Sequence, residues 1–476
     1  MTNAPSTEEL RGRKLDARLV MSIAATGIMS FAGVAVETAM NITFPVLMEE
    51  FSVNTATVQW ITTGYLLVLA VVVPVSAYLK RRFAMHSLFL AAIALFTAGV
   101  LLCLFAPAFW VLLLGRIVQG VGTGIALPLM FNIVIEQAPL DKMGMMMGIA
   151  NLITAIAPAV GPSVGGFIAS TFGWRAIFVA LLPLLALSFV MGATSIRQSS
   201  ETGPAKFAVG QFALLAGSFS CLVFATNSAS TAGWLSPRVL VLLAGFAVLL
   251  VLFCVVSRRS QHPLVHVECF AHAPFSFSIA YLVLFQMIVL ALSYIIPYYA
   301  QTVRGLDEFA AGCLLLPGCT IGAILCPFGG KILDRLGPKR PILLGAASQL
   351  LAIVLFATVG MGGSIVRITV IYIFITIGQG LSISNSATNG LRYLPDELKT
   401  DGNACFNTLQ QLGGAMGTAT ATAIMNSAQT GASDLVLATT AGARQIFSML
   451  LCVSIASVCC AVAVFVAARL QGRRAR

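Results

Sequence analysis

A glutamate, Glu37, lies in the middle of a long apolar run that extends from about Leu19 to Leu47. A carboxylate at that depth in a membrane costs several kcal/mol unless it is protonated, paired or in contact with water, so acids in such positions usually serve a function. Helical spacing places a stripe of neighbours on the same face: Ser30, Gly33, Glu37, Asn41 and Phe44. The pattern predicts a cavity-lining site for a proton or a cation.

Arg116 is the second charge within an apolar run, about eight residues from the outer end of its predicted span. At a rise of 1.5 Å per residue it lies roughly 12 Å deep, and Glu37 lies roughly 15 Å deep in its own span. The similar depths predict an ion pair or a water-bridged pair that exchanges protons. The alternative, in which Arg116 bonds backbone carbonyls and only holds helices together, stays open at this point.

The elements that must position these charges are membrane-spanning helices. Of the 476 residues, 58% are hydrophobic and 9% charged, whereas a soluble domain has roughly 25% charged residues. Runs of about 18 apolar residues can cross a bilayer. We predict fourteen: 19–47, 56–79, 87–106, 108–136, 143–170, 174–196, 208–228, 236–257, 274–301, 308–334, 340–358, 364–394, 400–427 and 444–468. The fold class is therefore an all-α polytopic membrane protein.

The Lys and Arg residues indicate the orientation. With the N-terminus in the cytoplasm, most of the 28 basic residues fall in cytoplasmic segments. An even number of spans then predicts a multi-pass protein of the cell membrane with both termini in the cytoplasm. The first span lacks a small-residue cleavage site, so we expect it to be retained. The net charge of +11 is explained by these loops, which face anionic lipid. It therefore does not indicate that the protein binds nucleic acid.

Other kinds of chemistry lack candidates in the sequence. The eleven cysteines fall mostly within spans without metal-ligand spacing, which is typical of apolar packing. His86, His262, His266 and His272 all fall in predicted cytoplasmic loops, which argues against a buried histidine relay. No GxxxxGK[ST] loop is present. We predict no catalytic residue, no metal and no cofactor, and we exclude an enzyme and an ATP-driven pump.

The two halves of the chain resemble each other. Gln119-Gly120 in the fourth span recurs as Gln379-Gly380 in the twelfth, and the loops after the second and tenth spans also align. Two six-span halves fit a transporter with its substrate site near the midplane. The predicted segments are a cytoplasmic tail 1–18, a first half 19–196, an insertion 197–273 with two extra spans, a second half 274–468 and a basic tail 469–476. We expect the two extra spans to pack at the periphery.

These motifs resemble the major facilitator superfamily, and within it the fourteen-span drug:proton antiporters of the EmrB/QacA type, in the lincomycin-efflux-like branch. Gly330–Arg340 resembles the signature loop between second and third spans, Arg116–Gly122 the fourth-span motif and Gly161–Gly166 the fifth-span antiporter motif. Glu37–Pro45 resembles the first-span motif, whose acid is more usually Asp. The resemblance covers the whole chain and implies the major facilitator fold, two six-helix halves plus two additional helices.

The gating residues come from two of these motifs. Gly161, Pro162, Gly165 and Gly166 make one face of the fifth span small, so that a neighbouring helix can approach closely. We expect this face to pack on a helix of the other half and to close one gate. An ordinary tight helix crossing would use the same residues.

The loop of the second half supplies the other gating residues. Gly337 permits a tight turn, and Asp334 can accept hydrogen bonds from a helix N-terminus or from an arginine across the interface of the halves. With Arg335 and Arg340, it is predicted to latch the cytoplasmic side. In the first half Arg81 stands where the signature has an acid, which implies a latch carried by the second half alone.

Substrate contact is predicted from amide and aromatic side chains on the spans, since such walls suit bulky amphipathic ligands. The candidates are Asn41, Phe44, Trp60, Gln119, Phe131, Gln286, Tyr294, Tyr298, Gln379, Asn385, Asn407 and Gln410. For each of them, ordinary packing or interhelical hydrogen bonding explains the residue equally well.

The leading interpretation is a proton-coupled secondary active exporter, an antiporter of small amphipathic compounds that produces multidrug efflux and antibiotic resistance by alternating access. A single deep carboxylate, Glu37, predicts lipophilic monocations, zwitterions or neutral drugs as substrates and dications as poor ones. Protons and membrane lipid are the other partners, and we expect a monomer. The alternatives are a dedicated exporter of one endogenous metabolite and a non-transporting membrane receptor.

Overall fold

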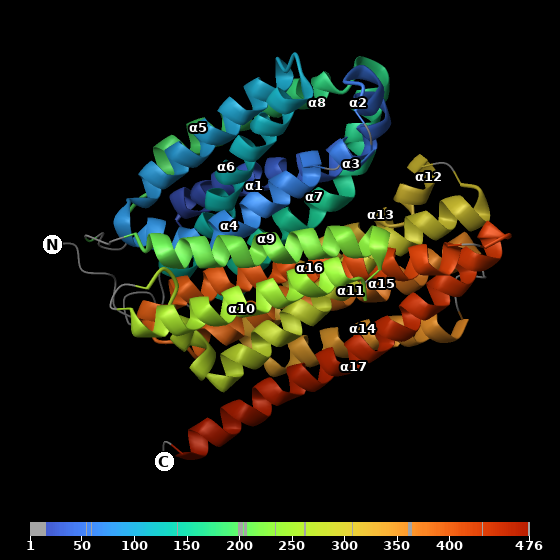
Figure 1. Cartoon of the computed structure of the whole chain (residues 1–476). Helices are drawn as coiled ribbons and strands as arrows, with labels where there is room; N and C mark the ends of the chain where they lie inside the picture. The colour runs from blue at the N-terminus through green and yellow to red at the C-terminus, as the bar shows by residue number, and fades with distance from the viewer. Residues whose placement is uncertain are drawn as a thin grey trace. The chain divides into compact units, whose positions relative to one another are not determined.

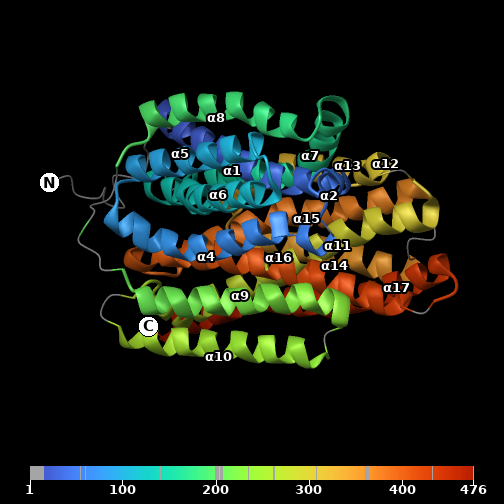
Figure 2. The same ribbon diagram turned by 45° about the horizontal axis from the view of Figure 1, so that its top comes forward.

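The computed structural model of this chain describes residues 16–53, 55–58, 60–139, 141–198, 203, 207–233, 235–260, 263–306, 308–359, 364–430 and 432–474. Every regular element in this part is a helix (Figures 1 and 2). The chain divides into two compact units, the first ending at Ala208 and the second beginning at Val209. The predicted tail 1–18 lies almost wholly outside the described residues.

The described part of the first unit has six long helices and two short ones. They are α1 (Ala17–Ile42), α2 (Phe44–Glu50), α3 (Thr55–Val58), α4 (Trp60–Arg82), α5 (Met85–Leu104), α6 (Phe109–Gln137), α7 (Met143–Phe172) and α8 (Arg175–Ser195). Helix α6 lies at the centre, where it packs on α5, α4 and α1, and α1 in turn packs on α7 and α8. The two helices that carry Glu37 and Arg116 are therefore direct neighbours.

The second unit repeats this arrangement after two additional helices. Its elements are α9 (Val209–Ala232), α10 (Pro237–Arg259), η1 (Val267–Ala271), α11 (Ala273–Arg304), α12 (Glu308–Cys313), α13 (Leu316–Leu336), α14 (Lys339–Val359), α15 (Ile365–Arg392), η2 (Asp396–Leu398), α16 (Lys399–Gln429) and α17 (Leu435–Arg474). Helix α15 packs on α13, α14 and α11, and α11 packs on α16 and α17. Each pairing has its counterpart in the first unit, in the same order along the chain.

Close crossings between helices depend on glycine in both units. A Cβ atom added to Gly99 on α5 would lie 2.6 Å from the carbonyl oxygen of Gly115 on α6, and one added to Gly115 would lie 2.9 Å from that of Gly99. Gly345 on α14 and Gly378 on α15 have the same reciprocal relation, at 2.8 and 2.7 Å. Such backbone contact is typical of helices that associate in lipid.

The long helices agree with the predicted spans. Among the described residues fourteen helices have 20 or more residues, and each overlaps one predicted span. Twelve stretches are also apolar enough to cross a membrane. Helix α7 contributes only the shorter apolar stretch Met143–Thr154, and α16 is rich in Thr, Gly and amide residues. The all-helical polytopic class is confirmed, while the count of fourteen spans stays a prediction.

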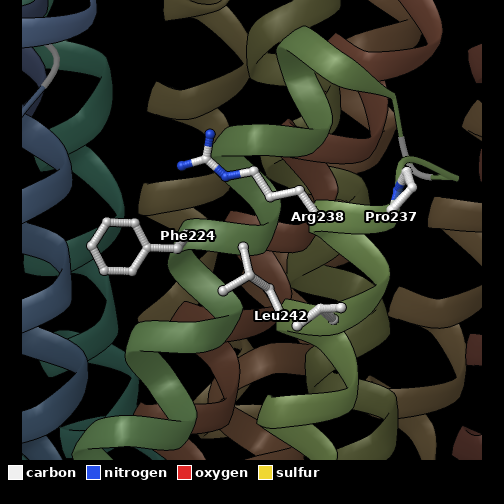
Figure 3. A pocket seen from close by; sticks show the side chains of 5 residues that line it. Phe224, Pro237, Arg238 and Leu242 are labelled. Carbon is white, nitrogen blue, oxygen red and sulfur yellow. The ribbon is translucent and has the colours of Figure 1, made fainter.

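The two inserted helices, α9 and α10, belong to the second unit. Helix α9 packs on α16, whereas α10 packs mainly on α9 and lies at the edge of the unit (Figure 2). A cavity opens between the two helices near the start of α10 (Figure 3). Ser236 caps that start, because its hydroxyl accepts a hydrogen bond from the Val239 N–H at 3.4 Å.

Candidate functional site

Arg116 on α6 is fully buried and is held by its own helix and by α4. Its Nη1 donates to Oε1 of Gln119 at 2.6 Å, and its Nε donates to the carbonyl oxygen of Ile61 at 3.5 Å. The guanidinium carbon lies 4.2 Å from the centroid of the Tyr65 ring, a distance at which a cation is attracted to the ring face. These three contacts fix the position of the charge between α4 and α6.

Tyr65 connects this charge to the helix that carries Glu37. Its hydroxyl lies 3.0 Å from the carbonyl oxygen of Gly33 on α1 and 2.9 Å from Oγ1 of Thr123 on α6. Thr123 in turn donates to the carbonyl oxygen of Gln119 at 3.1 Å. Gly33 stands one helical turn before Glu37. We refer to Arg116, Gln119, Tyr65, Thr123 and the Gly33 carbonyl as the arginine network.

Glu37 is partly exposed, and the charge of Arg116 acts on it electrostatically. In the described part of the chain, no ion pair or hydrogen bond joins the two side chains directly. The predicted direct pair is therefore not formed in this conformation, because Arg116 bonds to Gln119 and stacks on Tyr65 instead. The water-bridged form of the pair stays a prediction.

The arginine network retains two buried donors that are not satisfied. Among the described residues, Nη2 of Arg116 and Nε2 of Gln119 have no hydrogen-bond partner. A buried donor without an acceptor costs about 1–3 kcal/mol, and more when it is charged. The network therefore favours the approach of an acceptor atom, such as a carboxylate oxygen or a water oxygen.

The small face of α7 packs on α1 of its own unit. A Cβ atom at Gly161 would lie 2.0 Å from Oγ1 of Thr38, and one at Gly165 would lie 2.4 Å from Cβ of Ala39. The closest neighbour of these two glycines is therefore α1, whose small residues offer the matching surface, and a partner helix from the other half stays a prediction. Thr38 and Ala39 directly follow Glu37, so α7 rests on the segment that carries the acid.

Pro162 and Gly166 are the other two residues of the fifth-span motif. Gly166 is partly exposed, and the side chain of Pro162 lies outside the described part. A role of the four residues in gating stays a prediction.

Asp334 lies at the end of α13 and pairs with Arg392 at the end of α15, with 3.8 Å between Oδ1 and Nη2. Gly337 ends α13 with a φ of 80°, a backbone conformation that glycine adopts at little cost. Arg335 and Arg340 are exposed. This pair lies within the second unit, and a partner of Asp334 across the halves stays a prediction.

The first unit has an ion pair at the corresponding place. Lys80 at the end of α4 pairs with Glu136 at the end of α6. The substitution of the signature acid by Arg81 had implied that only the second half has an ionic contact at this position. The Lys80–Glu136 pair shows that the first half has one as well. The signs of the two charges are exchanged, because the first unit has the cation on α4 and the anion on α6, whereas the second unit has the anion on α13 and the cation on α15.

Four predicted substrate residues lie in two pairs along the line where α11 packs on α16. Nε2 of Gln410 donates to Oε1 of Gln286 at 3.3 Å. The rings of Tyr294 and Tyr298 stack with 5.5 Å between centroids, and the Tyr298 hydroxyl donates to Oε1 of Gln429 at 3.0 Å. All four predicted residues are partly exposed. We refer to these five residues as the amide–tyrosine seam.

The remaining predicted substrate residues are distributed more widely. Gln119, Phe131 and Asn385 are buried: Gln119 belongs to the arginine network, Phe131 to the apolar core of the first unit, and Asn385 donates to the carbonyl oxygen of Leu381 at 2.6 Å. Phe44, Trp60, Gln379 and Asn407 are partly exposed. The side chain of Asn41 lies outside the described part.

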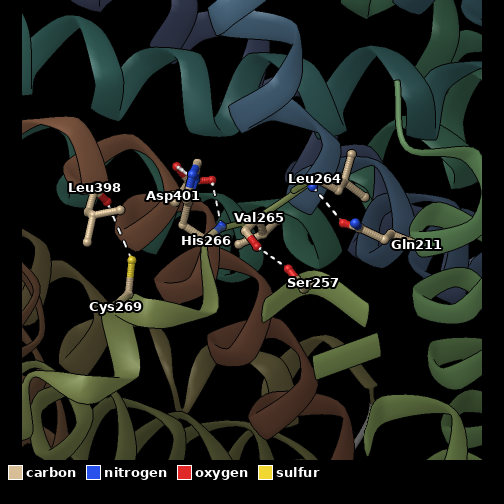
Figure 4. Close-up of polar contacts among 8 residues, drawn as sticks. All are labelled: Gln211, Ser257, Leu264, Val265, His266, Cys269, Leu398 and Asp401. Carbon is tan, nitrogen blue, oxygen red and sulfur yellow. Dashed lines mark hydrogen bonds and ion pairs between the residues drawn. The ribbon is translucent and has the colours of Figure 1, made fainter. Parts of the chain in front are cut away.

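A buried acid that sequence reasoning missed, Asp401, lies in the first turn of α16. It is fully buried and contacts both the backbone N–H and the ring Nδ1 of His266, at 3.3 and 3.2 Å (Figure 4). The same loop is tied to α9 and α10, because Gln211 accepts from the Leu264 N–H and Ser257 donates to the Val265 carbonyl, both at 2.7 Å. The available signal was an acid inside the predicted span 400–427.

Two helical units with the same internal packing, a buried arginine and a partly exposed acid within spans, and long apolar helices are typical of a membrane transporter. The chain matches the Major Facilitator Superfamily over residues 26–418 and belongs to that family. It is therefore a transporter and not an enzyme, and the predicted major facilitator fold is confirmed.

Its relatives include three bacterial proteins. Lincomycin resistance protein LmrB of Listeria monocytogenes is 33% identical over 449 residues, covering 92% of this chain and 95% of the relative. The protein of the same name from Bacillus subtilis is 35% identical, with 84% of each chain covered. Multidrug resistance protein B homolog of Mycobacterium tuberculosis is 28% identical, covering 67% of this chain and 59% of the relative.

Two solved structures share the fold. The human organic anion transporter MFSD10 has a TM-score of 0.65 at 12% identity, with 94% of this chain and 100% of that chain covered. The proton:xylose symporter XylE has a TM-score of 0.64 at 13% identity, with 93% and 94% covered. At these identities the similarity describes the fold alone.

Proposed function

We propose that this chain is a proton-coupled antiporter that exports small amphipathic compounds by alternating access. The observation that carries the proposal is the arginine network, which joins the buried Arg116 on α6 to α1 one turn from Glu37. Arg116 is a buried cation with an unsatisfied donor, and Glu37 is a partly exposed acid near it. The attraction between the two side chains therefore depends on whether Glu37 is protonated.

The two charge states of Glu37 would act differently on α1. As a carboxylate, Glu37 is attracted toward the free donors on Arg116 and Gln119. Once protonated, it loses that attraction, and Arg116 is held by Gln119, Tyr65 and the Ile61 carbonyl, as in the described conformation. Because Gly161 and Gly165 rest on the turn after Glu37, a shift of α1 would be transmitted to α7.

The names of the relatives support drugs as substrates, since they include lincomycin resistance and multidrug resistance proteins. The amide–tyrosine seam supplies aromatic faces and amide groups on partly exposed side chains, which suit amphipathic ligands. We propose that lipophilic monocations, zwitterions and neutral drugs are exported, and that dications are exported poorly because Glu37 balances a single charge. The protein would act as a monomer in the cell membrane, with both termini in the cytoplasm.

Proton movement in proteoliposomes tests the proposal. Vesicles that contain the purified protein and an internal pH dye receive a lipophilic monocation, a lincosamide-like amine or a neutral drug, each paired with vesicles of the Glu37→Gln variant. Drug-driven proton flux in the wild type, absent in the variant, is expected. Drug movement without proton movement would refute the coupling.

Two further results separate the alternatives. Drug binding without any flux would favour a membrane receptor. Flux with none of the panel compounds but with one endogenous metabolite would favour a dedicated exporter.

A further inference from the structure

The inserted helices form a ligand-sized groove that the proposed transport function does not use. Its volume is about 410 Å³, and it is lined by Phe224 on α9 and by Pro237, Arg238, Val241 and Leu242 on α10. In Figure 3 the Arg238 side chain extends across the groove toward the side of Phe224, and Leu242 lies below it. The groove thus has an apolar interior and a cationic group at one end.

The surroundings of the groove indicate that it faces lipid. Helix α10 packs mainly on α9, and large apolar side chains along it are exposed, among them the groove residue Val241 at 71%, Val248 at 58% and Val251 at 61%. Apolar faces of this kind lie against acyl chains when a helix is in a bilayer. An apolar groove on the same face would be filled by an acyl chain.

The charge of Arg238 indicates which kind of headgroup would fit the end of the groove. It is exposed, and no residue in the described part of the chain forms an ion pair or hydrogen bond with it. A guanidinium binds phosphate through two parallel hydrogen bonds. Arg238 also lies in the first turn of α10, where the positive end of the helix dipole favours an anion. The charge of the groove's end therefore complements an anionic headgroup.

We infer that the groove between α9 and α10 binds one anionic phospholipid, with its phosphate on Arg238 and one acyl chain against Phe224, Val241 and Leu242. Arg238 and Leu242 are separated by one turn, roughly 6 Å along the helix, which is the order in which a phospholipid presents phosphate and then chain. The volume lies within the roughly 300–1,000 Å³ of small-ligand sites. The inference does not rest on the proposed transport function.

Native mass spectrometry of the full-length protein, released from detergent and titrated with phosphatidylglycerol or phosphatidylcholine, tests the inference. We expect the wild type to retain one phosphatidylglycerol in preference to phosphatidylcholine. Arg238→Gln should weaken this binding about fivefold, the effect of one basic residue near an anionic surface. Leu242→Trp keeps the charge and fills the groove, so it should weaken the binding of both lipids. Arg367→Gln removes an exposed arginine at the start of α15 and, as the matched control, should leave binding unchanged.

Three results would overturn the inference. The first is equal phosphatidylglycerol binding by the wild type and Arg238→Gln. The second is equal binding of both lipids to the wild type, which is the behaviour of an arginine that only reaches the interface. The third is a wild-type dimer that Leu242→Trp abolishes, since the groove would then belong to a second copy of the chain.

Discussion

Tyr65→Phe isolates one hydroxyl group in the arginine network. The substitution keeps the ring beneath Arg116, where the guanidinium carbon lies 4.2 Å from its centroid, and removes only the bonds at 3.0 and 2.9 Å to Gly33 and Thr123. Neither partner is orphaned: the Gly33 carbonyl lies within helix α1, and Thr123 still donates to Gln119. We therefore expect a loss of about 0.5–1.5 kcal/mol in the free energy of unfolding, the net contribution of a hydrogen bond whose removal leaves no partner unsatisfied.

The assay is reversible unfolding in mixed micelles, run as a double-mutant cycle with Thr123→Val. Because the two side chains share one hydrogen bond, their effects should fail to add by about 0.5–1 kcal/mol. Tyr281→Phe is the matched control, since its hydroxyl donates to Ser382 at 2.7 Å in the second unit. It should destabilise the protein similarly but leave the pH dependence of transport unchanged, whereas Tyr65→Phe should shift that dependence.

Two outcomes would refute the reasoning. Strict additivity of Tyr65→Phe and Thr123→Val would mean that their hydroxyl groups do not interact. Identical pH profiles for Tyr65→Phe and the wild type would mean that the link from Arg116 to α1 does not serve proton coupling.

Four other changes test separate parts of the structure. Glu37→Gln mimics the protonated acid, so gradient-driven export should stop while expression and folding persist; coupled export at wild-type rates would place the proton site elsewhere. Arg116→Ala should shift the pH midpoint of transport and be non-additive with Glu37→Gln, and strict additivity would leave Arg116 a structural residue. Gly161→Leu should block transport by forcing α7 away from Thr38, whereas normal flux would show that this crossing is loose. Hydrogen bonds from Trp174 and Arg175 lower the pKa of Glu50 from its ordinary 4.5. The stability they add is therefore present above pH 4.5 and is lost as the pH falls through the lowered value. The thermal unfolding midpoints of Glu50→Gln and the wild type should converge at acid pH, and a difference that stays constant with pH would refute this.

The arrangement of helices was largely accessible from the sequence. Apolar runs long enough to cross a bilayer gave the long helices, and the recurrence of Gln119-Gly120 as Gln379-Gly380 foretold that α6 and α15 occupy equivalent places in their units. Gln286, Tyr294 and Tyr298 were also predicted as candidates for substrate contact, all on one span. That this span packs on α16 came only with the structure, because the sequence of one helix does not determine its neighbour.

Rotation of helices about their axes explains the predictions that the structure changed. The depth of Arg116 in its span was readable, but whether its side chain turns to α1 or to α4 depends on packing, and it turns to Tyr65 and Ile61. For the same reason a small face on α7 could not reveal that its partner is α1. Asp401 was missed because an acid in the first turn of a helix commonly serves the helix dipole, and nothing in the local sequence brings His266 to it.

The exchanged signs of the ion pairs at the ends of the helices bear on whether equivalent helices of the two halves are interchangeable. An exchange of α4 and α13 between the units would bring Lys80 beside Arg392 and Asp334 beside Glu136. Two like charges would then meet where two opposite ones now attract. The helices α4 and α13 are therefore equivalent in position but not interchangeable in charge, and each half keeps its own pairing.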